Sequence, residues 1–351
     1  MTTTEQSART PPDQHLALGR LDLALGAHLP DTRLSYITLG KLNAQGDNAI
    51  LILHGYTSSH RFVFPNDPDN AEGSWGELIG PGKAIDTQRY FVVAPNALGS
   101  SYGSTGPADT NPDTQRRWGP DFPALTFEDQ VNAQARLLDH LNIKQLHAVI
   151  GLSMGGFGAF QWAVQHPTRM RKIIPVLSAP WGSLNQSASH QAVDQVLQAN
   201  QAWQGGWYYG REALLEPTLI DIRKKTLQRY GVPAWLQATL QSVDQATERL
   251  DEMATHWARQ FDANALQVLR AAINRFDVRE QLDRAQAELM YVLCRTDALF
   301  PPSIASETLD RWPKTTGRAK YVEIDSAYGH FASSLDGQKW ANDLQTFLDQ
   351  R

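Results

Sequence analysis

A single serine stands among four glycines in the stretch AVIGLSMGGFGAF, residues 148–160. Within it, GLSMG fits the pattern G-x-S-x-G, in which a tight turn between a strand and a helix exposes the hydroxyl of Ser153. Glycine costs roughly 0.5–1 kcal/mol relative to alanine inside regular elements, so such a cluster needs a geometric reason. The alternative is a glycine-rich turn with an incidental serine. The rest of the chain must therefore supply the groups that a nucleophilic serine requires.

A serine hydroxyl is a weak nucleophile at neutral pH and needs a histidine base that is oriented by a carboxylate. In folds with this serine turn, the order along the chain is Ser, then Asp or Glu, then His. Asp297 follows an apolar run that ends at Cys294, and His330 follows the last apolar run. The sequence therefore predicts a catalytic triad of Ser153, Asp297 and His330. Asp325, near the end of the last run, is the alternative acid.

Such a reaction also needs two backbone N–H groups that stabilise the oxyanion of the tetrahedral intermediate. The usual donors are the residue after the nucleophile and a residue in the loop after the third strand. Met154 follows the serine, and Tyr56 follows the apolar run 49–53 within the tripeptide HGY. We therefore predict Tyr56 and Met154 as the oxyanion donors. Because all these positions are filled, a non-catalytic binding protein is disfavoured.

Short apolar runs alternate with helical patterns along most of the chain. Two strand-like stretches between residues 15 and 42, broken at Gly26 and Pro30, come first. Buried strands are then indicated at 49–53, 90–94, 146–150, 172–178, 289–293 and 321–324. This alternation predicts an α/β fold with a mostly parallel central sheet flanked by helices.

The strand pattern stops between residues 181 and 284, which contain five of the ten tryptophans. A helical segment inserted between two core strands predicts a cap over the carboxyl ends of the sheet, where open α/β sheets bind ligands. The alternative is a second packing layer without a ligand role. The predicted organisation is a loose tail over 1–14, an α/β core over 15–180 and 285–351, and a helical cap over 181–284.

The composition narrows the class of protein. The 42 % hydrophobic and 20 % charged residues are typical of a globular chain, and the net charge of −5 argues against nucleic acid or an anionic membrane as partner. The single cysteine, Cys294, excludes an intrachain disulfide. No apolar leader or run of 18 apolar residues is visible, so we expect a cytoplasmic protein. No H-E-x-x-H motif or cysteine pair predicts a metal site.

Five segments give the sequence a specific resemblance: 80–112, 151–156, 202–210, 297–302 and 328–330. Together they resemble the homoserine O-acetyltransferase family of α/β-hydrolases, over most of the chain. The resemblance implies the α/β-hydrolase fold, a helical cap that encloses a tunnel to the serine, and a homodimer built through the cap helices. It implies the same triad and oxyanion donors. No cofactor is implied beyond the acyl donor, which in the transferases is acetyl-CoA.

Two positions depart from the transferases. There an aspartate commonly follows the catalytic histidine and holds the ammonium group of homoserine, whereas this chain has Phe331. Leu152 stands where those enzymes usually have glycine. By contrast, Arg223 is a candidate match for the arginine that binds the substrate carboxylate in the transferases. Without an anion at the position of Phe331, the ammonium group of homoserine would lose a charge-assisted hydrogen bond, which costs about 1.5–3 kcal/mol of binding free energy. We therefore predict a serine esterase that cleaves small short-chain acyl esters, mainly acetates, through an acyl-enzyme. The alternative is a homoserine O-acetyltransferase that uses acetyl-CoA by a ping-pong mechanism.

Overall fold

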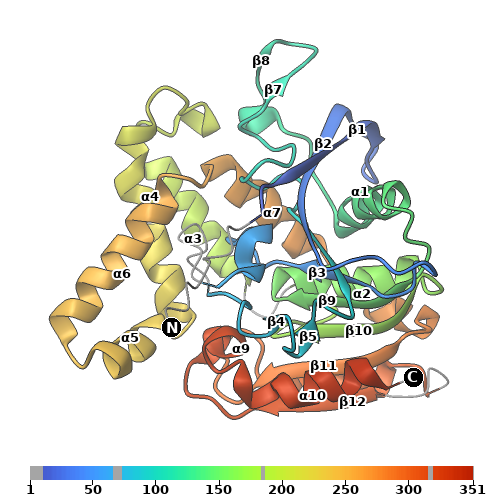
Figure 1. The fold of residues 1–351 in the computed structure, drawn as a ribbon. Helices are drawn as coiled ribbons and strands as arrows, with labels where there is room; N and C mark the ends of the chain where they lie inside the picture. The colour runs from blue at the N-terminus through green and yellow to red at the C-terminus, as the bar shows by residue number, and fades with distance from the viewer. Residues whose placement is uncertain (1–10, 66–72, 183–185, 315–318, 351) are drawn as a thin grey trace, which may run out of the picture.

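The computed structural model describes residues 11–65, 73–182, 186–314 and 319–350, and its centre is one eight-stranded sheet (Figure 1). The strand order is β1-β2-β6-β3-β9-β10-β11-β12. Strand β2 runs antiparallel to both β1 and β6, and all pairs from β6 to β12 are parallel. The predicted α/β fold with a mostly parallel sheet is therefore confirmed. The strands are β1 (Gln14–Asp22), β2 (His28–Leu39), β3 (Ala49–Leu53), β6 (Phe91–Pro95), β9 (Leu146–Leu152), β10 (Met170–Val176), β11 (Glu288–Cys294) and β12 (Ala319–Ile324).

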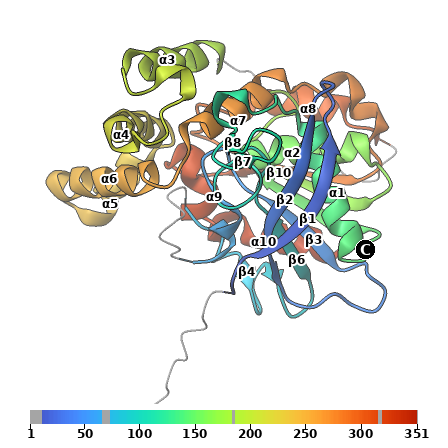
Figure 2. The ribbon, with the colours of Figure 1, turned by 90° about the horizontal axis from the view of Figure 1, so that it is seen from above.

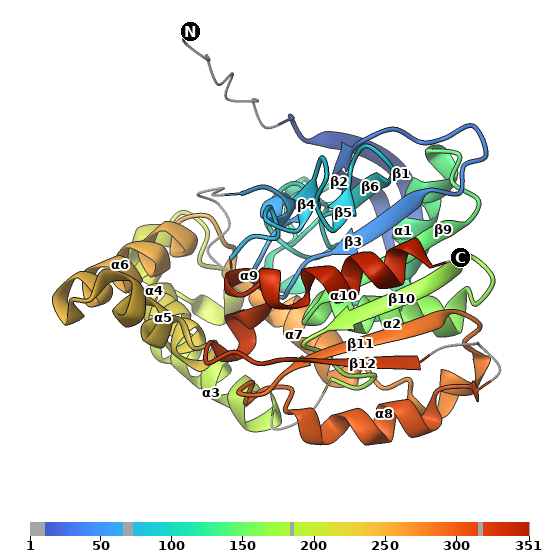
Figure 3. The same cartoon turned by 60° about the horizontal axis from the view of Figure 1, so that its bottom comes forward.

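Both faces of the sheet are covered, which explains why its strands read as continuous apolar runs. In β3, Leu51 and Leu53 belong to the same hydrophobic cluster as α1 and α2, whereas Ile50 and Ile52 pack with Trp340 of α10. Figure 3 shows α10 on one side of the strands and α2 on the other. The helices around the sheet are α1 (Phe127–His140), α2 (Met154–Gln165), α8 (Ala305–Arg311), α9 (Ala332–Leu335) and α10 (Gln338–Asp349).

Five α-helices are described between β10 and β11, and we call α3–α7 the inserted helices. Figures 1 and 2 show α3, α4, α5 and α6 beside the sheet. Trp181, Trp203 and Trp257 of this part of the chain are buried, so much of its aromatic content serves packing. The domain boundaries and the function of the segment as a cap stay predictions. The helices are α3 (Gln186–Ala199), α4 (Glu212–Arg229), α5 (Val232–Leu240), α6 (Val243–Ala258) and α7 (Ala263–Arg275).

Short elements complete the connections between these layers. Two small ladders pair β4 with β5 and β7 with β8. Their bounds are β4 (Ile79–Gly80), β5 (Ile85–Asp86), β7 (Thr110–Asn111) and β8 (Arg116–Arg117). The short 3₁₀ helices among the described residues are η1 (His60–Val63), η2 (Gly119–Asp121), η3 (Gln204–Gly206), η4 (Arg279–Arg284), η5 (Pro302–Ile304) and η7 (Gly329–Phe331).

The N-terminal region differs from its prediction at one proline. Pro30 was expected to break a strand, but it lies inside β2. Its neighbour Leu29 pairs with Leu21, and the next pair joins Thr32 to Gly19, so Pro30 lies where the register shifts. A proline is tolerated there because no regular ladder bond is lost. Most of the predicted tail, residues 1–10, lies outside the described residues. None of the described helices is both long and apolar enough to span a bilayer.

Candidate active site

Ser153 occupies the turn that joins β9 to α2. Its φ of 53° and ψ of −112° are unusual for a residue with a side chain. The backbone at this point leaves a buried strand and enters a helix within one residue, which turns the side chain out of both elements. This conformation is the one expected for a serine whose hydroxyl must be presented to a substrate.

The flanking glycines have a geometric reason. A Cβ at Gly151 would collide with the carbonyl of Gly155, and a Cβ at Gly155 would collide with the carbonyl of Leu53 in the neighbouring strand. A Cβ at Gly156 would meet the side chain of Ser178. The glycine cluster thus allows the turn to pass against β3 and its own helix. The incidental-serine alternative leaves this arrangement unexplained.

The structure brings Ser153, His330 and Asp297 together. His330 Nε2 lies 2.9 Å from Ser153 Oγ, and its Nδ1 lies 2.8 Å from Asp297 Oδ2. Since the carboxylate can only accept, Nδ1–H donates to it and Nε2 is left to accept from the serine hydroxyl. Asp297 is itself oriented by the Leu299 N–H, which donates to Oδ1 at 2.8 Å. These three side chains have the geometry of a serine, its base and an orienting acid.

The alternative acid lies elsewhere. Asp325 is paired with Arg295 at 2.7 Å and its side chain is 82 % exposed, whereas Asp297 is 2 % exposed. A buried carboxylate next to the imidazole stabilises an imidazolium far better than a solvated one, because water screens the exposed charge. The geometry therefore favours Asp297 over Asp325.

The two predicted oxyanion donors lie in different segments of the chain. Met154 is the first residue of α2, and Tyr56 lies in the loop after β3. We call residues 54–58 the oxyanion loop. Gly55, which precedes Tyr56, lines a small pocket together with Ser153 and His330. Met154 therefore adjoins the serine along the chain, and the residue before Tyr56 lines the same pocket as Ser153.

Three inserted helices hydrogen-bond to the oxyanion loop, two through side chains and one through a backbone carbonyl. Arg223 Nη1 on α4 donates to Thr57 Oγ1 at 2.7 Å, and Trp257 Nε1 on α6 donates to the Thr57 carbonyl at 3.0 Å. The Tyr56 hydroxyl donates to the Leu266 carbonyl on α7 at 2.7 Å. Arg223 is fully buried, with its guanidinium 5.1 Å from the centre of the Trp257 ring. The sequence analysis had singled out Arg223 but missed the contacts of Thr57 and Trp257.

The pocket at the serine is small and largely apolar. Its lining also includes Leu152, Tyr230 and Phe331. The Tyr230 ring lies 4.8 Å from the His330 ring, and Phe331, which is 4 % exposed, packs against Tyr230. No carboxylate lines this pocket among the described residues. The departures predicted at Leu152 and Phe331 thus both lie where a substrate would contact the nucleophile.

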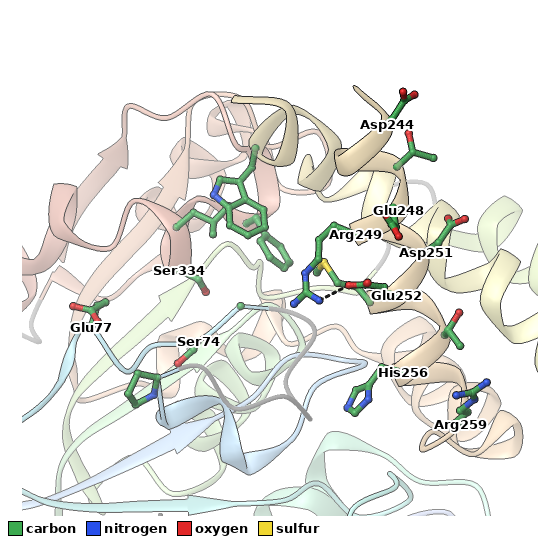
Figure 4. A pocket seen from close by; sticks show the side chains of 18 residues that line it. Ser74, Glu77, Asp244, Glu248, Arg249, Asp251, Glu252, His256, Arg259 and Ser334 are labelled. Atoms are coloured by element: carbon green, nitrogen blue, oxygen red, sulfur yellow. Dashed lines mark hydrogen bonds and ion pairs between the residues drawn. The ribbon is translucent and has the colours of Figure 1, made fainter. Parts of the chain in front are cut away.

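A larger groove of about 1240 Å³ lies on the other side of Phe331. In Figure 4 the acidic side chains of α6 form one wall, and Ser74, Glu77 and Ser334 lie across from them. Its lining holds five carboxylates and two arginines. One arginine, Arg249, pairs with Glu252 at 2.8 Å. The groove is therefore negative overall, and Phe331 separates it from the pocket at Ser153.

The described residues hold no group of three or more His, Cys, Asp or Glu side chains that could bind a metal ion.

Comparison with known proteins places this architecture in a family. The family model described as the alpha/beta hydrolase fold matches residues 48–336. A homoserine O-acetyltransferase of Moorella thermoacetica is 36 % identical over 350 residues, which cover 94 % of each chain. A homoserine O-succinyltransferase of Methylibium petroleiphilum is 35 % identical, covering 93 % of this chain and 91 % of its own.

Solved structures extend the comparison to esterases. The homoserine O-acetyltransferase of Bacillus anthracis superposes with a TM-score of 0.86 at 25 % identity, covering 97 % of this chain and 98 % of its own. Esterase E22 superposes equally well, with a TM-score of 0.86 at 26 % identity and coverage of 96 % and 100 %. Fold and sequence together define an enzyme of the α/β-hydrolase class. Within that class, the chain belongs to the homoserine O-acetyltransferase-like family.

Proposed function

We propose that this enzyme forms an acyl-enzyme on Ser153 and transfers a short acyl group from a thioester such as acetyl-CoA to the hydroxyl of homoserine. The observation that carries the proposal is the hydrogen-bonded chain from Ser153 through His330 to Asp297 in a protein whose relatives are homoserine acyltransferases. The relatives support transfer to homoserine better than the ester hydrolysis that the sequence analysis favoured.

The triad geometry suits both halves of a ping-pong reaction. In the first, Ser153 Oγ attacks the acyl carbonyl as its proton passes to His330 Nε2, and the N–H groups of Tyr56 and Met154 stabilise the oxyanion. The tetrahedral intermediate collapses when His330 returns this proton to the leaving sulfur. In the second half, His330 takes the proton of the acceptor hydroxyl, which attacks the acyl-serine. His330 then gives this proton to Ser153 Oγ as the new ester leaves.

Arg223 supports an acceptor that carries a carboxylate. Its guanidinium is fully buried and is held by Thr57, which adjoins the predicted oxyanion donor Tyr56. A buried arginine with fixed geometry is well suited to bind a carboxylate through two hydrogen bonds. In this proposal Arg223 binds the carboxylate of homoserine and so places its hydroxyl near His330.

Hydrolysis of small acetate esters is the second candidate, and Phe331 favours it. The buried phenyl ring beside His330 provides no anion for an ammonium group. The negative groove on its far side also disfavours a polyanionic donor such as acetyl-CoA. In this candidate, water attacks the acyl-serine in place of homoserine.

One comparison of turnover distinguishes the two candidates. The purified enzyme is given acetyl-CoA or succinyl-CoA with homoserine, and separately ethyl acetate or p-nitrophenyl acetate, with Ser153→Ala as the blank. We expect O-acylhomoserine to form faster than any simple ester is hydrolysed. We also expect Arg223→Met to raise the KM for homoserine about 10- to 100-fold, from the loss of a charge-assisted hydrogen bond. Faster hydrolysis in the presence of millimolar homoserine would replace the transferase with the esterase.

A further inference from the structure

His54 is a buried histidine that lies next to the proposed oxyanion donor but not in the triad. Its Nδ1 lies 2.8 Å from the carbonyl oxygen of Gly55, and its Nε2 accepts the Ala97 N–H at 3.0 Å. The side chain is 2 % exposed at the end of β3. The sequence analysis assigned no role to this histidine.

The hydrogen bonds assign the tautomer of His54. A backbone N–H can only donate, so Nε2, which faces the Ala97 N–H, must be unprotonated. The proton is then on Nδ1, and Nδ1–H donates to the Gly55 carbonyl. Burial lowers the pKa of His54 to about 4, so the imidazole stays neutral and this tautomer persists near neutral pH. His54 is therefore a fixed donor toward one carbonyl oxygen.

That carbonyl belongs to the same peptide group as the Tyr56 N–H. A trans peptide is planar, and its C=O and N–H point in opposite directions. No cis peptide bond occurs among the described residues. When His54 and the Ser58 N–H, 3.3 Å away, both donate to the Gly55 oxygen, the direction of the Tyr56 N–H is fixed as well.

We infer that His54 is a positioning residue that orients the Gly55–Tyr56 peptide so that the Tyr56 N–H faces the oxyanion of the acyl-transfer intermediate. This inference rests on the proposed acyl-serine chemistry but not on the identity of the acceptor. In this inference His54 contributes to transition-state stabilisation through the Tyr56 N–H and does not touch the substrate itself. A rotated peptide would instead direct the Gly55 carbonyl at the oxyanion, which is electrostatically unfavourable.

Two substitutions separate the two hydrogen bonds of the ring. The side-chain amide nitrogen of asparagine is as many bonds from Cβ as Nδ1, so His54→Asn can still donate to the Gly55 oxygen. The amide oxygen of glutamine matches Nε2, so His54→Gln can still accept the Ala97 N–H but loses the Gly55 bond. Both variants lose one buried hydrogen bond, and a purely structural role predicts similar losses of activity in both.

We expect His54→Gln to lower kcat for p-nitrophenyl acetate about 10- to 100-fold with little change in KM. This is below the roughly 10²- to 10³-fold loss for removal of an oxyanion donor, because the N–H is displaced and not deleted. His54→Asn should stay within about fivefold of wild type. Parallel losses in the two variants, or an unchanged kcat in His54→Gln, would overturn the inference.

A second readout does not depend on the folded fraction. In the thiono analogue of the ester, sulfur replaces the carbonyl oxygen and is a weak hydrogen-bond acceptor. The ratio of kcat/KM for the ester to that for the thionoester therefore reports on the oxyanion donors. It should fall about tenfold or more in His54→Gln and stay near the wild-type value in His54→Asn. A ratio that falls in His54→Asn, or that stays at the wild-type value in His54→Gln, contradicts the inference.

Failure of the proposed chemistry gives a different result. If Ser153→Ala turned over p-nitrophenyl acetate as wild type does, and wild type were not labelled by a serine-reactive fluorophosphonate, the acyl-serine itself would be wrong. If wild type is labelled and active but the His54 variants behave alike, only the positioning role fails.

Discussion

The triad and the oxyanion loop meet at Ser153, yet they are held by different parts of the molecule. Ser153, Asp297 and His330 follow β9, β11 and β12, so the sheet itself places them. The oxyanion loop follows β3 but is bonded to α4, α6 and α7 of the inserted helices. The positions of the triad residues thus depend on the sheet, whereas the support of the oxyanion loop depends on the insertion.

The substitution with the largest expected effect on turnover is Ser153→Ala. Removing the nucleophile of a serine enzyme costs up to about 10⁶-fold in kcat. We expect loss of turnover by at least 10⁴-fold, with an urea midpoint close to that of wild type, since the turn depends on Gly151 and Gly155. Turnover above a few per cent of wild type would remove the nucleophile from the proposal.

Asp297→Asn should have the next largest effect. An amide in place of the carboxylate favours the wrong tautomer of His330, and the equivalent change in serine proteases lowers kcat about 10⁴-fold. Asp325→Asn is the matched control, and it should change kcat less than twofold because Asp325 pairs with Arg295 at the surface. A larger loss in the control would transfer the acid role to Asp325.

Phe331→Asp changes a residue that lies between the triad and the inserted helix α4. Phe331 follows the catalytic histidine and packs against Tyr230 at the end of α4. A carboxylate there could bind the ammonium group of homoserine, and we expect the ratio of transfer to hydrolysis to rise about tenfold or more. Phe331→Asn is the control, because it creates a similar cavity without the charge. An equal ratio in both variants would show that the ammonium group binds elsewhere.

Trp257→Phe should have the smallest effect on activity. The change deletes the hydrogen bond to the Thr57 carbonyl but keeps an aromatic ring beside Arg223. A typical buried hydrogen bond contributes about 0.5–1.5 kcal/mol, which corresponds to roughly 2- to 13-fold in rate if it is all expressed in the transition state. The preferred substrate should not change. Complete inactivation of a folded Trp257→Phe variant would contradict the division between core and insertion.

The sequence predicted the sheet and the triad because each strand and each triad residue is marked by the residues next to it in the chain. The six core strands are contiguous apolar runs, and Ser153, Asp297 and His330 each lie a few residues beyond such a run. The choice between Asp297 and Asp325 could not be made with certainty from order alone. It needed their burial and the distance to the imidazole.

The support of the oxyanion loop could not be predicted in this way. Thr57 is 166 residues from Arg223 and 200 residues from Trp257, and nothing in the spacing of these residues indicates that they meet. His54 is the first residue of the loop, but its tautomer follows only from its contact with Ala97, which follows β6 and lies 3.0 Å away. Such contacts depend on the tertiary packing of helices whose sequences show only amphipathic patterns.

The backbone conformation of Ser153 also has a consequence for thermal stability. A non-glycine residue at a φ of 53° with this ψ stores roughly 1–3 kcal/mol of strain, which the native packing must offset. Glycine adopts such a φ freely but loses about 0.4–1 kcal/mol through the greater freedom of the unfolded chain. We therefore expect Ser153→Gly, although inactive, to melt a few degrees above Ser153→Ala in calorimetry. A lower Tm for the glycine variant would mean that the turn is not strained. A higher one would mean that this enzyme is less heat-resistant than its fold allows, because its nucleophile must be presented at a turn that disfavours side chains.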